Sequence, residues 1–237
     1  MTVARLAVSG HTVRMMQSRL LMWGLLLAMV SVSLGCQTTP SSPYEQYLAE
    51  KERNDAAVAQ IQSLGGRIHR TDPGTAVLIA NTDERETGQA IELLDDIMLL
   101  DSLRLTEAQL SPGNLRPLEG LYLRHLTVSR TTLTERTLPA LFSLTGLRSV
   151  HLIDTNAGDA AIAHLADFDD LETLTFAYEP LTDAGVAELA MFPRLRTLRL
   201  VETEVSEEAL RDLVAVNTRL VVELGDDRII RGVDATR

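Results

Sequence analysis

Cysteine is almost absent from this sequence. Cys36 is the only one among 237 residues, so no disulfide can form within the chain, and stability outside the cytoplasm must come from packing alone. The G-x-S-x-G and H-E-x-x-H motifs, the phosphate-binding loop and the dinucleotide fingerprint are also missing. The sequence therefore predicts a protein that is not an enzyme and that holds no metal or cofactor.

Long apolar runs are absent as well. The longest, residues 20–35, has 16 residues, whereas a helix that crosses a bilayer needs about 20. The run follows three arginines and ends at Cys36, which is the arrangement of an export signal. We predict that residues 1–35 are a signal peptide. Because the arginine-bearing region is long for such a signal, translation is expected to start at Met15 or Met16.

Positive charge is scarce. The chain has 22 basic and 33 acidic residues, which gives a net charge of -11, and only Lys51 is a lysine. Removal of the predicted signal takes away three arginines and no acid, which leaves 19 basic against 33 acidic residues and a net charge of -14. Such a surface repels nucleic acid and anionic lipid headgroups. The charge therefore excludes a nucleic-acid partner and favours a basic or neutral one.

What the sequence does contain is a repeat of 23 or 24 residues. Five units begin at residues 100, 123, 147, 171 and 195; in each, the first, fourth and sixth residues are apolar and the third and fifth are polar. This alternation is typical of a short strand with one buried face, and its repetition stacks such strands into a parallel sheet. The apolar positions are Leu100, Leu103, Leu105, Leu123, Leu126, Val128, Leu147, Val150, Leu152, Leu171, Leu174, Phe176, Leu195, Leu198 and Leu200.

The second half of each unit has helical spacing. Thr134, Thr182 and Ser206 each precede an apolar stripe, and a hydroxyl followed by acids in the first turn is a signal for a helix N-cap. We predict a helix after each of them, packed on the sheet through residues such as Val186 and Leu210. Each unit is thus expected to be one strand and one helix.

These units resemble leucine-rich repeats. The pattern Leu-x-x-Leu-x-Leu-x-x-Thr-x-Leu is met from Leu123 to Leu133, with Val128 in place of the third leucine. Residues 181–189 are similar to the cysteine-containing subclass and to bacterial repeats of the "LTDAGL" kind. The resemblance covers residues 76–224, and it implies an α/β leucine-rich repeat solenoid, or horseshoe, with a parallel sheet on the concave side and helices on the convex side.

The ninth residue of each unit departs from that family, which usually keeps asparagine or cysteine there to hydrogen-bond the loop backbone. Thr131, Thr155 and Thr203 can serve the loop instead. Ala108 cannot, and Glu179 is expected to point outward.

Residues 33–36, Ser-Leu-Gly-Cys, resemble the lipobox of bacterial lipoproteins, in which the cysteine is acylated and becomes the mature N-terminus. The resemblance implies that Cys36 is lipidated and that residues 36–43 are a flexible linker. An unpaired thiol after an ordinary cleavage site is the alternative. We expect an extracytoplasmic protein anchored to a membrane, which is the outer membrane in a didermic bacterium because no aspartate follows the cysteine.

Both ends of the repeats need a cover, because the terminal units would otherwise expose apolar surface. We predict an N-terminal cap over residues 44–75, with a helix that ends before a Gly-Gly pair and strands at residues 67–69 and 76–80. A degenerate last strand at residues 219–224 and a tail at residues 225–237 are expected at the other end. The helix positions expected to face inward are Tyr47, Leu48, Val58, Ile61 and Leu64.

The solvated face of the predicted sheet is the candidate binding surface. Small hydroxyls with a few larger side chains suit a peptide or a protein helix. His125 and His151 on adjacent strands, with Asp154 nearby, form no metal site because further ligands are missing. The residues selected as partner-binding are Arg104, His125, Thr127, His151, Thr175, Tyr178 and Arg199.

The leading interpretation is a non-catalytic, membrane-tethered protein–protein interaction module of the bacterial cell envelope. It binds an unidentified protein or peptide through the concave sheet face. One alternative is an envelope hydrolase or transferase that uses His125 and His151, and another is a purely structural spacer. The sequence leaves the oligomeric state open.

Overall fold

A computed structural model of the chain describes residues 42–71, 74–225 and 228–232. The predicted signal peptide, Cys36 and most of the predicted linker lie outside these residues. The chain divides into two compact units, residues 1–52 and residues 53–237.

The described part of the first unit is the start of helix α2 (Pro43–Ser63). The Glu45 amide donates to Ser42 Oγ (3.2 Å) and the Ser42 amide donates to Glu45 Oε2 (2.8 Å), so the two residues cap this helix reciprocally. The expectation that Tyr47 and Leu48 face inward is wrong, since they are 47 % and 38 % exposed. A single helix has no core of its own in which to bury them.

The second unit begins within the same helix. Ile61 is buried, and Val58 and Leu64 pack against the core, as predicted. The buried Asn54 uses its side-chain oxygen to accept a hydrogen bond from the Met98 amide (2.9 Å). This end of the helix is thereby held to the segment that precedes the first repeat.

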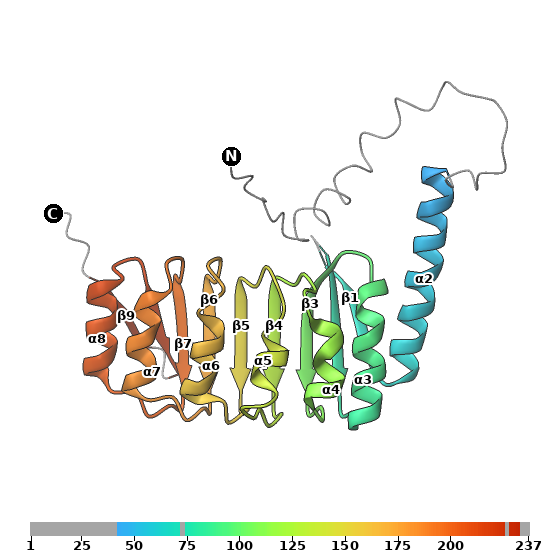
Figure 1. Ribbon diagram of the computed structural model, residues 1–237. Helices are drawn as coiled ribbons and strands as arrows, with labels where there is room; N and C mark the ends of the chain where they lie inside the picture. The colour runs from blue at the N-terminus through green and yellow to red at the C-terminus, as the bar shows by residue number, and fades with distance from the viewer. Residues whose placement is uncertain (1–41, 72–73, 226–227, 233–237) are drawn as a thin grey trace, which may run out of the picture. The chain divides into compact units, whose positions relative to one another are not determined.

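The described residues of the second unit form one sheet of nine strands, whose order in space is their order along the chain (Figure 1). Strands β2 to β8 run parallel to one another, while β1 pairs antiparallel with β2 and β9 pairs antiparallel with β8 at the two edges. The chain is therefore a mixed α/β protein with a largely parallel sheet. The strands are β1 (Arg67–Arg70), β2 (Thr75–Ala80), β3 (Leu100–Thr106), β4 (His125–Ser129), β5 (Ser149–Ile153), β6 (Thr173–Ala177), β7 (Thr197–Val201), β8 (Val221–Leu224) and β9 (Ile229–Arg231).

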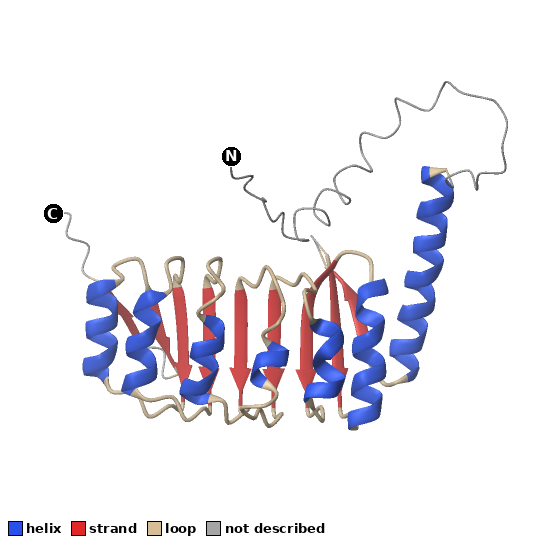
Figure 2. Cartoon of the chain, viewed as in Figure 1, coloured by secondary structure: helices blue, strands red, loops and turns tan. Residues whose placement is uncertain are grey.

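Short helices alternate with the parallel strands and lie on one face of the sheet (Figures 1 and 2). They are short because each strand, helix and return loop must close within 23 or 24 residues. The helices are α3 (Glu84–Glu92), η2 (Leu93–Asp96), α4 (Pro112–Leu115), η3 (Arg116–Leu118), α5 (Leu138–Leu141), α6 (Gly158–Leu165), α7 (Asp183–Glu188), η4 (Leu189–Met191) and α8 (Glu207–Val216).

The core lies between the sheet and these helices. Of the fifteen apolar repeat positions, all are buried except Leu100, which packs against the core while partly exposed. Val186 and Leu210 are buried from the helix side, as predicted. Each fully buried leucine contributes about 1.5–3 kcal/mol relative to exposure. The repeat thus builds one continuous apolar layer through the second unit.

Two of the predicted helix starts are linked by carboxylates. Ser206 is the N-cap of α8, and its hydroxyl accepts from the Ala209 amide (3.2 Å), as predicted. Thr182 holds the N-cap position of α7, but its hydroxyl donates to Asp159 Oδ2 (2.6 Å) instead of capping the helix. Asp183 accepts in the same way from the Ser206 amide (2.7 Å) and hydroxyl (2.8 Å), and these hydrogen bonds lower its pKa. A carboxylate at the start of one helix therefore holds the start of the next.

The third predicted helix start is displaced. Helix α5 begins at Leu138 and its N-cap is Thr137. The Thr134 amide donates to Thr137 Oγ1 (2.8 Å), and the Thr137 amide donates to Thr134 Oγ1 (3.3 Å). This reciprocal pair satisfies the amides in a turn, so the helix begins one turn later than the sequence predicts.

The ninth residues of the repeats lie inside the loops that follow the strands. Thr131 Oγ1 accepts from the Ala108 amide (3.2 Å) and donates to the Ser129 carbonyl (3.0 Å), so this threonine serves the loop as predicted. Thr155 is 1 % exposed, and its hydroxyl donates to a carboxylate of the following unit. Loops of neighbouring units are thus joined by side chains at this position.

That carboxylate belongs to Glu179, and the expectation that it points outward is wrong. Glu179 is 3 % exposed. Its Oε1 accepts from the Thr155 amide (2.6 Å) and hydroxyl (2.7 Å), and its Oε2 accepts from the amides of Ala157 (2.9 Å) and Gly158 (3.3 Å). The left-handed backbone at Asn156 (φ 59°) and Gly158 (φ 48°) turns these amides toward one point, where a carboxylate is the matching acceptor.

The last parallel strand, β8, lies within the predicted degenerate strand and is covered at its edge by β9. Strand β9 falls in the segment predicted as a tail, and the Leu224 amide donates to the Arg228 carbonyl (2.8 Å). Among the described residues, no helix is both long enough and apolar enough to cross a bilayer.

Candidate functional site

The face of the sheet opposite the helices carries the polar positions of the repeat; we call it the exposed face. Strand pairing aligns the third positions of the units in one column and the fifth positions in another, as predicted. The first column is Ser102, His125, Ser149, Thr173 and Thr197, and the second is Arg104, Thr127, His151, Thr175 and Arg199. Six of the seven predicted partner-binding residues lie in these columns.

The seventh, Tyr178, lies apart from them. It follows β6 at a position where every one of these units has a left-handed, non-glycine residue: Glu107, Arg130, Asp154, Tyr178 and Glu202. Its φ is 55° and its side chain is 60 % exposed. Since two of its flanking equivalents, Asp154 and Glu202, are acidic, Tyr178 belongs to an acidic rim and not to the centre of the exposed face.

A hydrogen-bonded group occupies the middle of the exposed face. His151 Nε2 lies 2.9 Å from Ser149 Oγ, and His151 Nδ1 lies 2.8 Å from Thr175 Oγ1. Ser149 and Thr175 are each 7 % exposed. Each imidazole nitrogen therefore has a hydroxyl partner, which fixes the orientation of the ring between β5 and β6. The spacing of the repeat predicts the register of these residues but not this hydrogen bonding.

The surroundings of His151 are cationic. Burial lowers the pKa of His151 below its ordinary value, and the positive charges of His125, Arg104 and Arg199 lower it further. The imidazole is therefore neutral at neutral pH. The side chains whose charges lower this pKa are all basic, so basic groups surround His151 on the exposed face.

The arginines of the exposed face are available to a ligand. Arg104 and Arg199 are exposed, and neither has a carboxylate within 4 Å in the described part of the chain. In the strand register Arg199 lies beside Glu223 of β8. The buried Asp101 is an ion-pair partner of Arg124, and its Oδ2 lies 3.8 Å from His125 Nε2. The negative net charge of the whole chain is therefore a poor guide to the charge of this face, which presents two arginines.

The two histidines of the exposed face lie on adjacent strands. The register pairs His125 with Ser149 and Thr127 with His151, so the imidazoles lie on the diagonal, as predicted. Among residues 42–71, 74–225 and 228–232, no three His, Cys, Asp or Glu side chains come together as a metal would require. Asp154 lies in the rim loop beyond β5.

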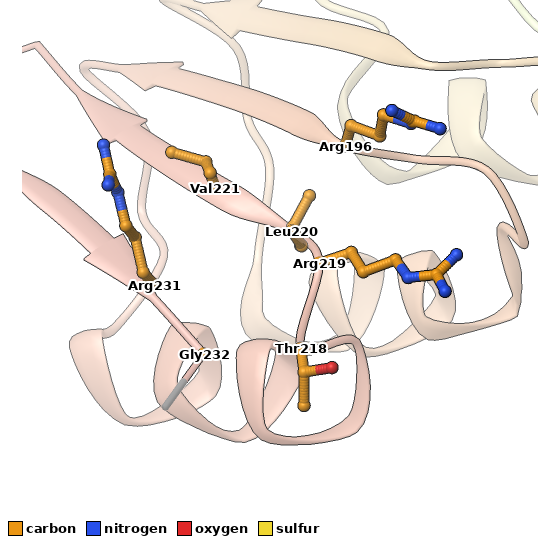
Figure 3. Close-up of a pocket in the computed structure, with 7 residues that line it drawn as sticks. All are labelled: Arg196, Thr218, Arg219, Leu220, Val221, Arg231 and Gly232. Carbon is orange, nitrogen blue, oxygen red and sulfur yellow. The ribbon is translucent and has the colours of Figure 1, made fainter. Parts of the chain in front are cut away.

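A pocket of about 480 Å³ at the end of the sheet was not predicted from the sequence (Figure 3). The antiparallel β9 brings Arg231 beside Val221, next to Arg196 and Arg219. Figure 3 shows that the Arg196 and Arg219 side chains extend to one side while Arg231 extends away from them. The three guanidinium groups therefore do not converge on one ligand position. No motif in the sequence signals this pocket, because it depends on the pairing of β9.

No family model matches the chain, and no curated protein is significantly similar to it. The function must therefore be inferred from the geometry of the exposed face.

Proposed function

We propose that the chain is a leucine-rich repeat module that binds a protein or peptide on the exposed face of its sheet, and that it is not an enzyme. The repeat spacing of 23 or 24 residues and the stacking of one strand per unit support the leucine-rich repeat assignment. Such repeats offer a long surface in place of a closed active site.

The observation that carries this proposal is the pair of aligned columns on the exposed face. Five successive strands present hydroxyls, two imidazoles and two arginines in register, and the short helices of the described residues lie on the opposite face of the sheet (Figure 2). Arginine is a residue type that often dominates binding energy at protein interfaces. A surface of this kind suits a partner segment laid across the strands.

One observation favours the alternative of a hydrolase: Ser149 Oγ lies within hydrogen-bonding distance of His151 Nε2. Three features argue against it. The other partner of His151 is the Thr175 hydroxyl, which does not stabilise an imidazolium as a carboxylate does. Burial, together with the neighbouring basic groups, lowers the pKa of His151 and so weakens it as a base. The strand amides are committed to the ladder and cannot serve as an oxyanion hole.

Site-specific crosslinking tests the binding function. Thr127, on the exposed face, and Met191, 77 % exposed on the helix side, would each be replaced by a photoreactive benzoylphenylalanine in the full chain in its native host. We expect a discrete adduct after irradiation from position 127 and none from position 191. Equal adducts from both positions, or none from position 127, would contradict binding through the exposed face and favour the structural spacer.

We propose further that the module lies outside the cytoplasm and is tethered to a membrane through acylated Cys36. The support is the resemblance of residues 33–36 to a lipobox and the position of Cys36 seven residues before Pro43, where α2 begins. A fully extended stretch of seven residues reaches roughly 23 Å, so the stretch from Cys36 to Pro43 is long enough to act as a linker between the membrane and helix α2.

Replacement of the anchor residue tests this tether. We expect Cys36→Ser to move the protein from the membrane fraction to the soluble fraction, because the variant has no acyl chain to hold it. Immunoblots of fractionated cells measure the change, and Ser41→Ala in the same segment is the matched control. Unchanged membrane fractionation of Cys36→Ser would count against the lipid anchor.

A further inference from the structure

We propose that the ligand of the exposed face is an acidic peptide segment in extended conformation, which crosses the strands and lays carboxylates against Arg104, His151 and Arg199. This inference rests on the proposed binding function. It names the chemical class of the partner, and it reverses the preference for a basic or neutral partner that the net charge of the chain suggests.

The spacing of the three residues fits an extended segment. They are all fifth positions, on β3, β5 and β7, so one strand separates each from the next. Neighbouring strands lie about 4.8 Å apart, which places Arg104 and Arg199 roughly 19 Å from each other with His151 midway. An extended chain rises about 3.3 Å per residue and presents a side chain to one face every 6.6 Å or so. A segment of about seven residues therefore spans the distance from Arg104 to Arg199, and its middle two face-on side chains, at roughly 6.6 and 13 Å, flank His151 on either side.

The charges of the exposed face complement carboxylates. Arg104 and Arg199 have no carboxylate partner within 4 Å among the described residues, and guanidinium groups bind carboxylates through paired hydrogen bonds. Thr127, between Arg104 and His151, is partly exposed and offers a further hydroxyl donor. Each exposed ion pair is weak alone, so the fit depends on several of them acting together.

A nucleic acid is also anionic but suits the face less well. A duplex carries one negative charge per 1.7 Å or so, which is about eleven charges over the same 19 Å. Two arginines and two histidines cannot balance that number, and the chain as a whole, at a net charge of -11, repels the excess. A seven-residue peptide places only three or four carboxylates on the face, a number much closer to the two guanidinium groups and two imidazoles that line it.

Binding of such a segment must also favour protonation of His151. A carboxylate seated beside the ring replaces repulsion by cations with attraction, so the pKa of His151 rises in the complex. The complex then holds more protons than the free protein between the two pKa values, and the affinity increases as pH falls through that window. The charged or titratable groups that face His151 from neighbouring strands are Arg104 on β3, His125 on β4, Arg199 on β7 and, beyond it, Glu223 on β8.

The test uses a fluorescein-labelled heptaglutamate peptide and the full chain purified in detergent. Fluorescence anisotropy at pH 7 should detect binding that Arg104→Glu/Arg199→Glu weakens about tenfold or more, since two attractive pairs become repulsive. Arg85→Glu/Arg136→Glu makes the same charge change at exposed positions on the helix side and should leave the affinity within about twofold. Circular dichroism verifies that both variants are folded.

The affinity for heptaglutamate, measured between pH 8 and pH 6, tests whether a carboxylate of the peptide binds beside the His151 imidazole. We expect binding to tighten about threefold or more on acidification in the wild-type chain and to lose this dependence in His151→Gln. An unchanged pH dependence in that variant would overturn the placement of a carboxylate on His151.

Other outcomes overturn the acidic ligand itself. Heptalysine or a seven-nucleotide oligothymidine that binds as tightly as heptaglutamate would do so, and so would equal affinity of the two double variants. Full-yield crosslinking from position 127 in the Arg104→Glu/Arg199→Glu chain would keep the binding function and reject only the acidic partner. Absence of crosslinks from position 127 in the unmodified background would reject the binding function.

Discussion

Leu174→Asp should abolish the cooperative thermal unfolding of the second unit. Leu174 is fully buried in β6, and the strand register places it between Val150 and Leu198 of the neighbouring units. An aspartate there puts an unpaired carboxylate into an apolar layer, at a cost of several kcal/mol. Whole domains are stable by only about 5–15 kcal/mol, so one such change removes much of the total.

The measurement is a thermal melt followed by circular dichroism. Thr173→Asp is the matched control, because the same charge is added one residue earlier, on the exposed face. The control should melt close to the wild-type temperature, since surface substitutions usually change stability by less than about 0.5 kcal/mol. A Leu174→Asp chain that melts cooperatively at the wild-type temperature would show that the strand register is wrong.

The strands were predictable from the sequence because their signal is local. Alternating apolar and polar residues with a spacing of 23 or 24 fix both which face is buried and which residues are neighbours. The columns through His125 and His151 follow directly from that spacing. The residues that line the exposed face were therefore predictable from the sequence.

The charge of that surface was not predictable in the same way. A net charge is a sum over the whole chain, whereas the potential beside His151 depends on Arg104 and Arg199, which lie nearby only once the strands are paired. The hydrogen bonds of His151 to Ser149 and Thr175 depend on side-chain rotamers, which the repeat pattern does not specify.

The wrong predictions for Thr182, Tyr47 and Leu48 have a different cause. Thr182 has the sequence signature of an N-cap, but its hydroxyl donates to Asp159 of the previous unit and makes no hydrogen bond to a helix amide. Tyr47 and Leu48 continue the apolar pattern of a helix beyond the point where the chain offers anything to bury it. In both cases the local sequence pattern is present. Whether it has the predicted effect depends on the hydrogen-bond and packing partners that other parts of the chain provide.

Glu179→Ala is expected to destabilise the second unit by about 3 kcal/mol or more. The substitution removes the acceptor of three backbone amides, those of Thr155, Ala157 and Gly158, and of the Thr155 hydroxyl. Each buried donor left without a partner costs about 1–3 kcal/mol. Because the carboxylate belongs to one unit and the amides to the previous one, the loss falls on the contact between them. Chemical denaturation of the purified chain measures the change in unfolding free energy.

Glu204→Ala is the matched control, because it removes the same charge from an exposed position one unit further along the chain. It should change stability by no more than about 0.5 kcal/mol. Glu179→Gln separates charge from geometry: the amide oxygen can still accept from Thr155, but its NH2 group meets the Ala157 and Gly158 amides donor against donor. We expect this variant to be destabilised too, with faster hydrogen exchange of those two amides than of the Thr155 amide. Equal stability of Glu179→Ala and Glu204→Ala would mean that the carboxylate does not hold the loop, and the sequence-based expectation that it points outward would then stand.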